Sequence, residues 1–185
     1  MIADIRYKAF GDKVIFNNFK LEIPEGVTIA IEGPSGKGKT TLLRILSGLD
    51  KDFDGAIENM PKKPIILFQE DRLVETISLE SNLLMVSDDK ERINYLLKEL
   101  RLDGELKNKI SSFSGGMKRR AAILRALLAD CDALFLDEPF KGLDGALKES
   151  VAALIRRENK GKTLILITHD RIEAELLNAE LFINL

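Results

Sequence analysis

The stretch Gly33-Pro34-Ser35-Gly36-Lys37-Gly38-Lys39-Thr40 decides the fold of this 185-residue chain, because it matches the pattern G-x-x-x-x-G-K-[ST]. A β-branched run from Val27 to Ile31 precedes it, and a helical pattern from Thr40 to Leu49 follows it. The glycines let the backbone turn its N–H groups inward as a cradle for anions, and the helix start adds further donors. The sequence therefore predicts a strand, a phosphate-binding loop and a helix in that order.

This loop predicts nucleotide binding. We expect Lys39 to reach the β- and γ-phosphates and the Thr40 hydroxyl to ligate Mg²⁺. A glycine-rich turn without a ligand is the alternative, and the flanking strand and helix disfavour it because a chance match in that context is rare. The expected contacts to the nucleotide are Gly33, Pro34, Ser35, Gly36, Lys37, Gly38, Lys39, Thr40 and Thr41.

Composition excludes several other classes of protein. Lys and Arg total 28 and Asp and Glu total 30, so a globally basic nucleic-acid binder is excluded. The single cysteine, Cys131, excludes a disulfide framework, and the single histidine, His169, excludes a multi-histidine metal site. No signal peptide and no membrane-spanning segment are expected, since no apolar run approaches the necessary length. A cytosolic setting follows as the default expectation.

Short apolar runs alternate with helical patterns along the chain. The runs show little polar alternation, which is typical of strands buried on both faces of a parallel sheet. We therefore predict an α/β fold, a P-loop NTPase core with a mostly parallel sheet. The further strands are expected at 65–68, 133–136 and 164–168, with one more after His169, and the further helices at 115–129, 143–159 and 170–177.

Two regions depart from that alternation. Residues 1–26 look like short antiparallel strands with turns at Gly11-Asp12 and Pro24-Glu25-Gly26, which predicts a small N-terminal antiparallel β region. Residues 74–110 contain no convincing strand, and 78–86 and 90–100 have helical patterns. We expect one domain over residues 1–185, with a core at 1–72 and 112–185 and an inserted helical subdomain at about 73–111.

Two further motifs carry chemistry. The run Ala133 to Glu138 is a buried strand that ends in two carboxylates, and it would deliver them to the edge of the sheet where α/β folds bind ligands. Asp137 suits the Mg²⁺ shell and Glu138 suits a general base, although solvated acids at a strand end are common by themselves. Ser114-Gly115-Gly116 would make a second anion-binding helix terminus; taken alone, it is more simply a helix N-cap.

Together these motifs resemble the ATP-binding-cassette (ABC) family, in the family's order and over nearly the whole chain. Ser114-Gly115-Gly116 is similar to the cassette signature, and Gly142-Leu143-Asp144 to the D-loop. The resemblance makes Gln69 the Q-loop glutamine, a contact to Mg²⁺, and His169 the switch histidine beside the γ-phosphate. It thus implies a catalytic set of Lys39, Gln69, Glu138 and His169, and a metal set of Thr40, Gln69 and Asp137.

Several positions leave alternatives open. The resemblance places an adenine-stacking aromatic at Phe10, with Tyr7 as a rival and a core role as the other interpretation. Gln69 could be a polar strand end and His169 an ordinary helix cap. The run Lys118 to Arg120 is interpreted as a solvated helix face. Met117 replaces the usual signature glutamine, so that side chain offers no polar contact there.

The resemblance implies an ATP-binding, ATP-hydrolysing subunit that powers solute transport by a membrane permease. It would work as a head-to-tail dimer, as a homodimer or a heterodimer, with Ser114 of one subunit closing over ATP held by Lys39 of the other. It would lie in the cytoplasm at the membrane face, receive a permease helix at residues 70–86, and bind no nucleic acid. The alternatives are a stand-alone ABC-type ATPase and a nucleotide-gated binding module without turnover, and the direction of transport stays open.

Overall fold

A five-stranded parallel sheet forms the centre of the computed structural model, which describes residues 1–185. The predicted strands are confirmed, and every residue of two neighbouring strands, β6 (Ala133–Asp137) and β7 (Thr163–Ile167), is buried. The strand order is β5-β6-β7-β3-β8, so β3, which leads into the glycine-rich loop, lies beside β7. The bounds are Pro64–Leu67 (β5), Ala133–Asp137 (β6), Thr163–Ile167 (β7), Thr28–Glu32 (β3) and Leu181–Asn184 (β8).

A second, antiparallel sheet has the order β2-β1-β4. The predicted hairpin is β1 (Ile2–Phe10) and β2 (Lys13–Glu22), joined at Gly11, whose φ of +55° suits a tight turn. Strand β4 (Asp54–Glu58) was not predicted, because its sequence contains no apolar run. Gly55 belongs there since a Cβ would lie 2.0 Å from the Asp4 carbonyl oxygen of β1.

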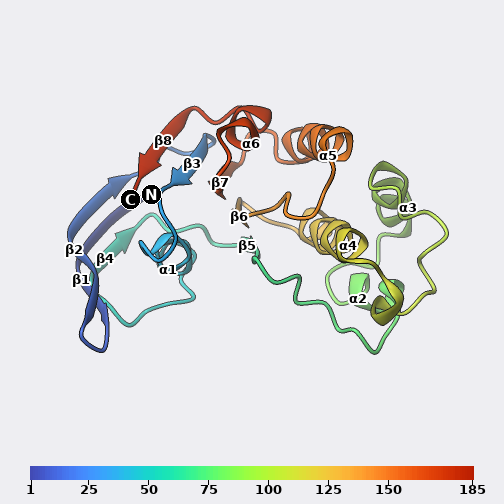
Figure 1. The fold of residues 1–185 in the computed structure, drawn as a ribbon, viewed down its shortest axis with the longest axis horizontal. Helices are drawn as coiled ribbons and strands as arrows, with labels where there is room; N and C mark the ends of the chain where they lie inside the picture. Colours follow the sequence, from blue (N-terminus) through green and yellow to red (C-terminus); the bar gives the residue numbers. More distant parts are fainter.

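Helix α1 (Lys39–Leu46) packs between the two sheets (Figure 1). Its apolar residues belong to the smaller of two core clusters, together with Ile5 and Phe16 of the antiparallel sheet. The helix ends before the predicted Leu49, because the backbone turns at Ser47 and at Gly48, whose φ is +75°. The glycine-rich loop is therefore held between a buried strand and a buried helix.

The remaining helices pack in the larger core cluster with alternate strand residues such as Leu134, Leu136 and Leu164, which face away from α1, so they lie on the other face of the sheet. Helices α2 to α4 are on the right of Figure 1. Between β5 and β6 the chain forms only helices, each α-helix there with a Ser or Asp side chain as its N-cap. We retain the subdomain limits of 73 and 111 as a proposal. The bounds are Leu79–Leu83 (α2), Lys90–Glu99 (α3), Ile110–Ser112 (η1), Gly115–Leu128 (α4), Gly145–Glu158 (α5) and Arg171–Leu176 (α6).

Candidate functional site

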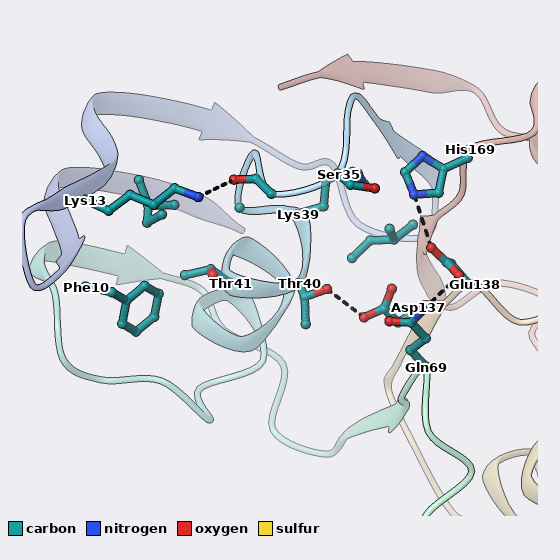
Figure 2. A pocket seen from close by; sticks show the side chains of 14 residues that line it. Phe10, Lys13, Ser35, Lys39, Thr40, Thr41, Gln69, Asp137, Glu138 and His169 are labelled. Carbon is teal, nitrogen blue, oxygen red and sulfur yellow. Dashed lines mark hydrogen bonds and ion pairs between the residues drawn. The ribbon is translucent and has the colours of Figure 1, made fainter.

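A cavity of about 370 Å³ opens at the carboxyl ends of β6 and β7, beside the glycine-rich loop (Figure 2). This is the edge at which α/β sheets bind ligands. Polar side chains from both sheets, from α1 and from the strand ends converge on it. The lining residues are Phe10, Lys13, Ile15, Ser35, Gly36, Gly38, Lys39, Thr40, Thr41, Gln69, Asp137, Glu138, Ile167 and His169.

The loop is shaped for an anion. Gly38 has a φ of +93°, and a Cβ there would lie 2.4 Å from Cγ2 of Ile15, so only glycine fits. Helix α1 begins at Lys39 with no side-chain cap, so N–H groups of its first turn are free to donate to a ligand. Glycine at this position therefore provides both the turn of the loop and its close approach to the side chains of β2.

Lys39 brings a buried cation to this loop. Its ammonium donates to the carbonyl oxygens of Gly33 and Pro34, at 2.7 and 3.0 Å, and the residue is only 6% exposed. Burial lowers the pKa of Lys39, and the carboxylates of Glu138 and Asp137 oppose that shift. A polyanion at the loop would favour the charged form of this group.

Thr40 and Asp137 bring two side-chain oxygens together in the lining of the cavity. The Thr40 hydroxyl donates to Oδ2 of Asp137 at 2.9 Å, and Asp137 is buried at the end of β6. Burial raises the pKa of Asp137, which the Thr40 hydrogen bond opposes and the neighbouring Glu138 reinforces. Adjacent hydroxyl and carboxylate oxygens fit Mg²⁺, which is commonly held by one or two carboxylates plus substrate phosphates.

Glu138 stands at the meeting point of three chain segments. Its Oε2 accepts a hydrogen bond from Nε2 of Gln69 at 3.2 Å, and its Oε1 lies 3.1 Å from Nε2 of His169 (Figure 2). Its backbone has a φ of +48°, a left-handed conformation that non-glycine residues rarely adopt. Such strain persists only where the surroundings fix it, and it is concentrated at functional sites.

The arrangement can bind a phosphate chain, hold a divalent cation and accept a proton from water. The sequence profile of the ABC transporter family matches residues 16–141 of this chain. The chain belongs to the ABC transporter family. It is an ATP-binding and ATP-hydrolysing subunit, as the sequence predicted, and the interpretation as a stand-alone ATPase is set aside. No helix in it is both long and apolar enough to cross a bilayer.

Named relatives and solved structures agree with this membership. The chain is 36% identical over 182 residues to an aliphatic sulfonates import ATP-binding protein of Pseudomonas syringae pv. tomato, covering 95% of this chain and 78% of the relative. The corresponding protein of Paracoccus denitrificans is 38% identical, with 92% and 73% covered.

Among solved structures, a dimeric bacterial ABC transporter cassette has a TM-score of 0.81 at 27% identity, covering 100% of this chain and 94% of that chain. A dimeric post-hydrolysis cassette bound to ADP and Pi has a TM-score of 0.80 at 27% identity, covering 95% and 91%.

This ABC subunit gathers most of the expected site residues but not all of them. Phe10 lines the cavity, and its rival Tyr7 lines a different hollow with Lys8 and Lys51. The expected contacts that do not line the cavity are Gly33, Pro34, Lys37, Ser114, Gly115 and Gly116. The carbonyls of Gly33 and Pro34 accept hydrogen bonds from the Lys39 ammonium. Ser114 is the N-cap of α4, and the two glycines that follow it begin that helix.

Three lining residues were missed by the sequence interpretation. Lys13, Ile15 and Ile167 lie on strands, and Lys13 donates from Nζ to the Gly36 carbonyl oxygen at 3.3 Å. No motif identifies the two residues of β2. Their position just after the Gly11 turn, beside Phe10, was the one available signal.

The interpretation of Lys118 to Arg120 as a solvated helix face is wrong for Arg119, which is 2% exposed. Helical spacing could have revealed this, because Ala122 and Ile123 follow Arg119 at i+3 and i+4 and are both buried. The guanidinium donates to the backbone carbonyls of Asp137 and Glu138, two residues that line the cavity.

Proposed function

We propose that this ABC ATPase powers import through a membrane permease and works as a head-to-tail dimer that closes on Mg-ATP. The observation that carries the proposal is that one subunit alone does not bring all of the expected ATP contacts to one cavity. One subunit surrounds its cavity with Lys39, Glu138 and His169, whereas its Ser114 helix terminus does not line that cavity. A second subunit could supply the Ser114 terminus, and the dimeric state of the similar cassette structures supports this.

In this proposal, the triphosphate replaces the carbonyl oxygens that Lys39 contacts. The ammonium leaves Gly33 and Pro34 for the β- and γ-phosphates, whose charge offsets the cost of its burial. The free N–H groups at the start of α1 donate to the same phosphates. The exposed Phe10 ring at the edge of the cavity stacks on the base.

Thr40, Asp137 and Gln69 are the residues that we propose hold Mg²⁺. The Thr40 and Asp137 oxygens are already adjacent, and the Gln69 side chain lines the same cavity. When bound, Mg²⁺ supplies neutralisation of the phosphate charge during transfer. Burial of Asp137 disfavours its charged form, so we expect the site to favour a compensating cation there.

Glu138 acts as the general base in the proposed reaction. A carboxylate oxygen accepts a proton from the water that attacks the γ-phosphorus atom, and the bond from that atom to the bridging oxygen of ADP breaks. Gln69 and His169 contact the two Glu138 oxygens and hold the carboxylate toward the cavity. We propose that His169 senses the γ-phosphate, since it lines the same cavity as the glycine-rich loop and lies on the Ser35 side of it (Figure 2).

A permease would dock beside the segment that carries Gln69. Apolar side chains at Val74, Leu84, Met85 and Val86 are exposed there, within the 70–86 segment predicted to receive a permease helix. We therefore propose a peripheral location at the cytoplasmic face of the membrane. We propose import as the direction because the similar relatives are import proteins for aliphatic sulfonates, and that solute class is the first cargo to test.

Dimer closure tests the proposal. The Glu138→Gln protein with Mg-ATP is expected to double in mass by light scattering, because bound ATP is not consumed. Adding Ser114→Glu is expected to abolish the dimer through charge repulsion with the partner's phosphates, while each subunit still binds ATP. Ser112→Glu is the matched control, since Ser112 is exposed and precedes α4. Persistent monomers of Glu138→Gln at saturating Mg-ATP refute the proposed dimer.

A further inference from the structure

Arg119 in the second turn of α4 is buried and fully bonded. Its residue exposure is 2%, and its guanidinium makes five hydrogen bonds, as many as it has N–H donors. Nε donates to the Pro139 carbonyl at 2.9 Å. Nη1 donates to the Phe68 carbonyl at 2.7 Å and to Asp71 Oδ1 at 3.1 Å. Nη2 donates to the Asp137 and Glu138 carbonyls, both at 2.8 Å.

This arrangement is costly for a residue that only fills space. Burial is the main cause that lowers the pKa of Arg119, and Asp71 is the only carboxylate that touches the guanidinium. An apolar side chain in its place would avoid that cost but would leave the five acceptors without this donor. Only arginine carries five donors in one rigid plane, so the site is built for simultaneous contact with several fixed acceptors.

The acceptors belong to two segments that flank Gln69 and Glu138. Phe68 and Asp71 lie on either side of Gln69, and three successive carbonyls at 137–139 include that of Glu138 itself. The side chains of Gln69 and Glu138 meet at 3.2 Å across the gap between these segments. The guanidinium therefore joins the same two segments through their backbones that Gln69 and Glu138 join through their side chains.

The strained backbone of Glu138 explains why such a clamp is needed. A φ of +48° is unfavourable for glutamate, and it is maintained only if neighbouring groups outweigh the preference for another conformation. Hydrogen bonds to the carbonyls before, at and after Glu138 fix the orientation of both adjacent peptide planes. Loss of these bonds would release the carboxylate from its direction into the cavity.

We propose that Arg119 is a positioning residue that holds Glu138 and Gln69 in register for hydrolysis at the ATP site of its own subunit. It does not line the cavity, so it acts through the two segments rather than on the nucleotide. The assignment rests on the proposed role of Glu138 as base. Arg119 shares α4 with Ser114, the residue proposed to contact the partner's nucleotide, so the two roles of this helix act on different ATP sites.

Steady-state kinetics give the first test. We expect Arg119→Met and Arg119→Lys to lower kcat by about 10- to 100-fold, because small displacements of a reacting group have effects of that order. The KM for ATP is expected to stay within about twofold, since no contact to the cavity is lost. Lysine keeps the charge but not the planar fork, so it should not restore the rate, and it provides the test if Arg119→Met fails to fold.

Arg120 provides a matched control on the same helix. Its guanidinium also donates to backbone carbonyls, those of Leu100, Arg101 and Gly116 at 2.7, 2.8 and 3.3 Å, and none of these residues lines the cavity or belongs to the segments around Gln69 and Glu138. Arg120→Lys is expected to keep kcat within about twofold of the unmodified protein. A kcat for Arg119→Lys within threefold of the unmodified value, or an equal loss in Arg120→Lys, overturns the proposal.

A tandem of two full-length copies joined by a flexible linker gives the second test. One copy carries Glu138→Gln, so turnover reports only the site whose base lies in the other copy. Arg119→Lys in the copy with intact Glu138 is expected to lower turnover by the factor seen above. The same change in the Glu138→Gln copy, which supplies Ser114 to the active site, is expected to leave turnover within about twofold.

Each result of the tandem test has one meaning. Loss only when Arg119→Lys accompanies the intact base supports the positioning role. Loss when it accompanies Glu138→Gln, or equal loss in both arrangements, overturns it, because Arg119 would then act through the Ser114 terminus or through general stability. If the tandem with Arg119 intact in both copies turns over but is unaffected by Ser114→Glu in the Glu138→Gln copy, the dimer proposal fails instead.

Discussion

Removing the carboxylate of Glu138 while keeping its shape is the most direct perturbation of the proposed chemistry. In Glu138→Gln, one amide oxygen can still accept from Gln69 or face His169, so the loss of bonding in the ground state is small. The amide cannot accept a proton from water at neutral pH. Asp137 cannot replace it, because that carboxyl is buried and paired with Thr40.

The expected magnitude follows from that geometry. A positioned general base contributes about 10²- to 10⁴-fold, and with no second base available the whole factor is lost. This corresponds to about 2.7–5.5 kcal/mol of transition-state stabilisation. ATP affinity is expected to hold or rise, since a negative charge near the phosphates disappears. Phosphate release measures the rate, and binding of a fluorescent ATP analogue measures the affinity.

Glu70→Gln is the matched control for charge. Glu70 follows Gln69, is exposed and does not line the cavity, although its charge contributes to the raised pKa of Asp137. We expect its kcat within about twofold of the unmodified protein. The reasoning is refuted if Glu138→Gln retains more than a third of the unmodified rate, or if Glu70→Gln loses as much.

Three other predictions concern the loop, the aromatic residue and the buried acid. Gly38→Ala combines a φ of +93° with a Cβ clash, so we expect the free energy of unfolding, measured in urea, to fall by about 2–4 kcal/mol. Gly104→Ala is the control: its φ is +89° but no atom lies near a Cβ there, so we expect a loss of about 1 kcal/mol. Phe10→Ala should raise the Kd for ATP by about 5- to 150-fold at unchanged kcat, whereas Tyr7→Ala should not; calorimetry measures this. Asp137→Asn should raise Tm at pH 7, because a raised pKa means that folding disfavours the charged carboxylate. That gain should shrink as pH falls through the raised pKa, and a constant gain would contradict the assignment.

The local sequence predicted the parallel core because its strands are unmistakable. Three of them, β3, β6 and β7, are short, apolar and bounded by turn residues, and burial on both faces requires that composition. Strand β4 escaped prediction for the converse reason. Its side chains alternate between half-buried and exposed, and its only strong requirement, a glycine at position 55, comes from the approach of β1.

The site followed the same division. Lys39 and Thr40 were predicted as site residues from their fixed spacing in the glycine-rich loop, and Asp137 from its place at the end of a buried strand, because phosphate and metal chemistry demands particular residue types there. Helical spacing could have revealed that Arg119 is buried, but not what it contacts. Four of its five acceptors are backbone carbonyls, at 68 and 137–139, and carbonyls carry no sequence signal. Lys13 was missed because it reaches the loop only through the pairing of β2 with β1.

The sequence by itself determined the order of strands and helices, the phosphate loop and the acidic strand end, since each depends on neighbours within a few residues. The tertiary structure decided which of those residues meet. The contacts of Glu138 with Gln69 and His169 join segments far apart in the chain, and their alignment depends on sheet register and on one buried guanidinium. Such contacts depend on how the whole core packs, so no local pattern encodes them.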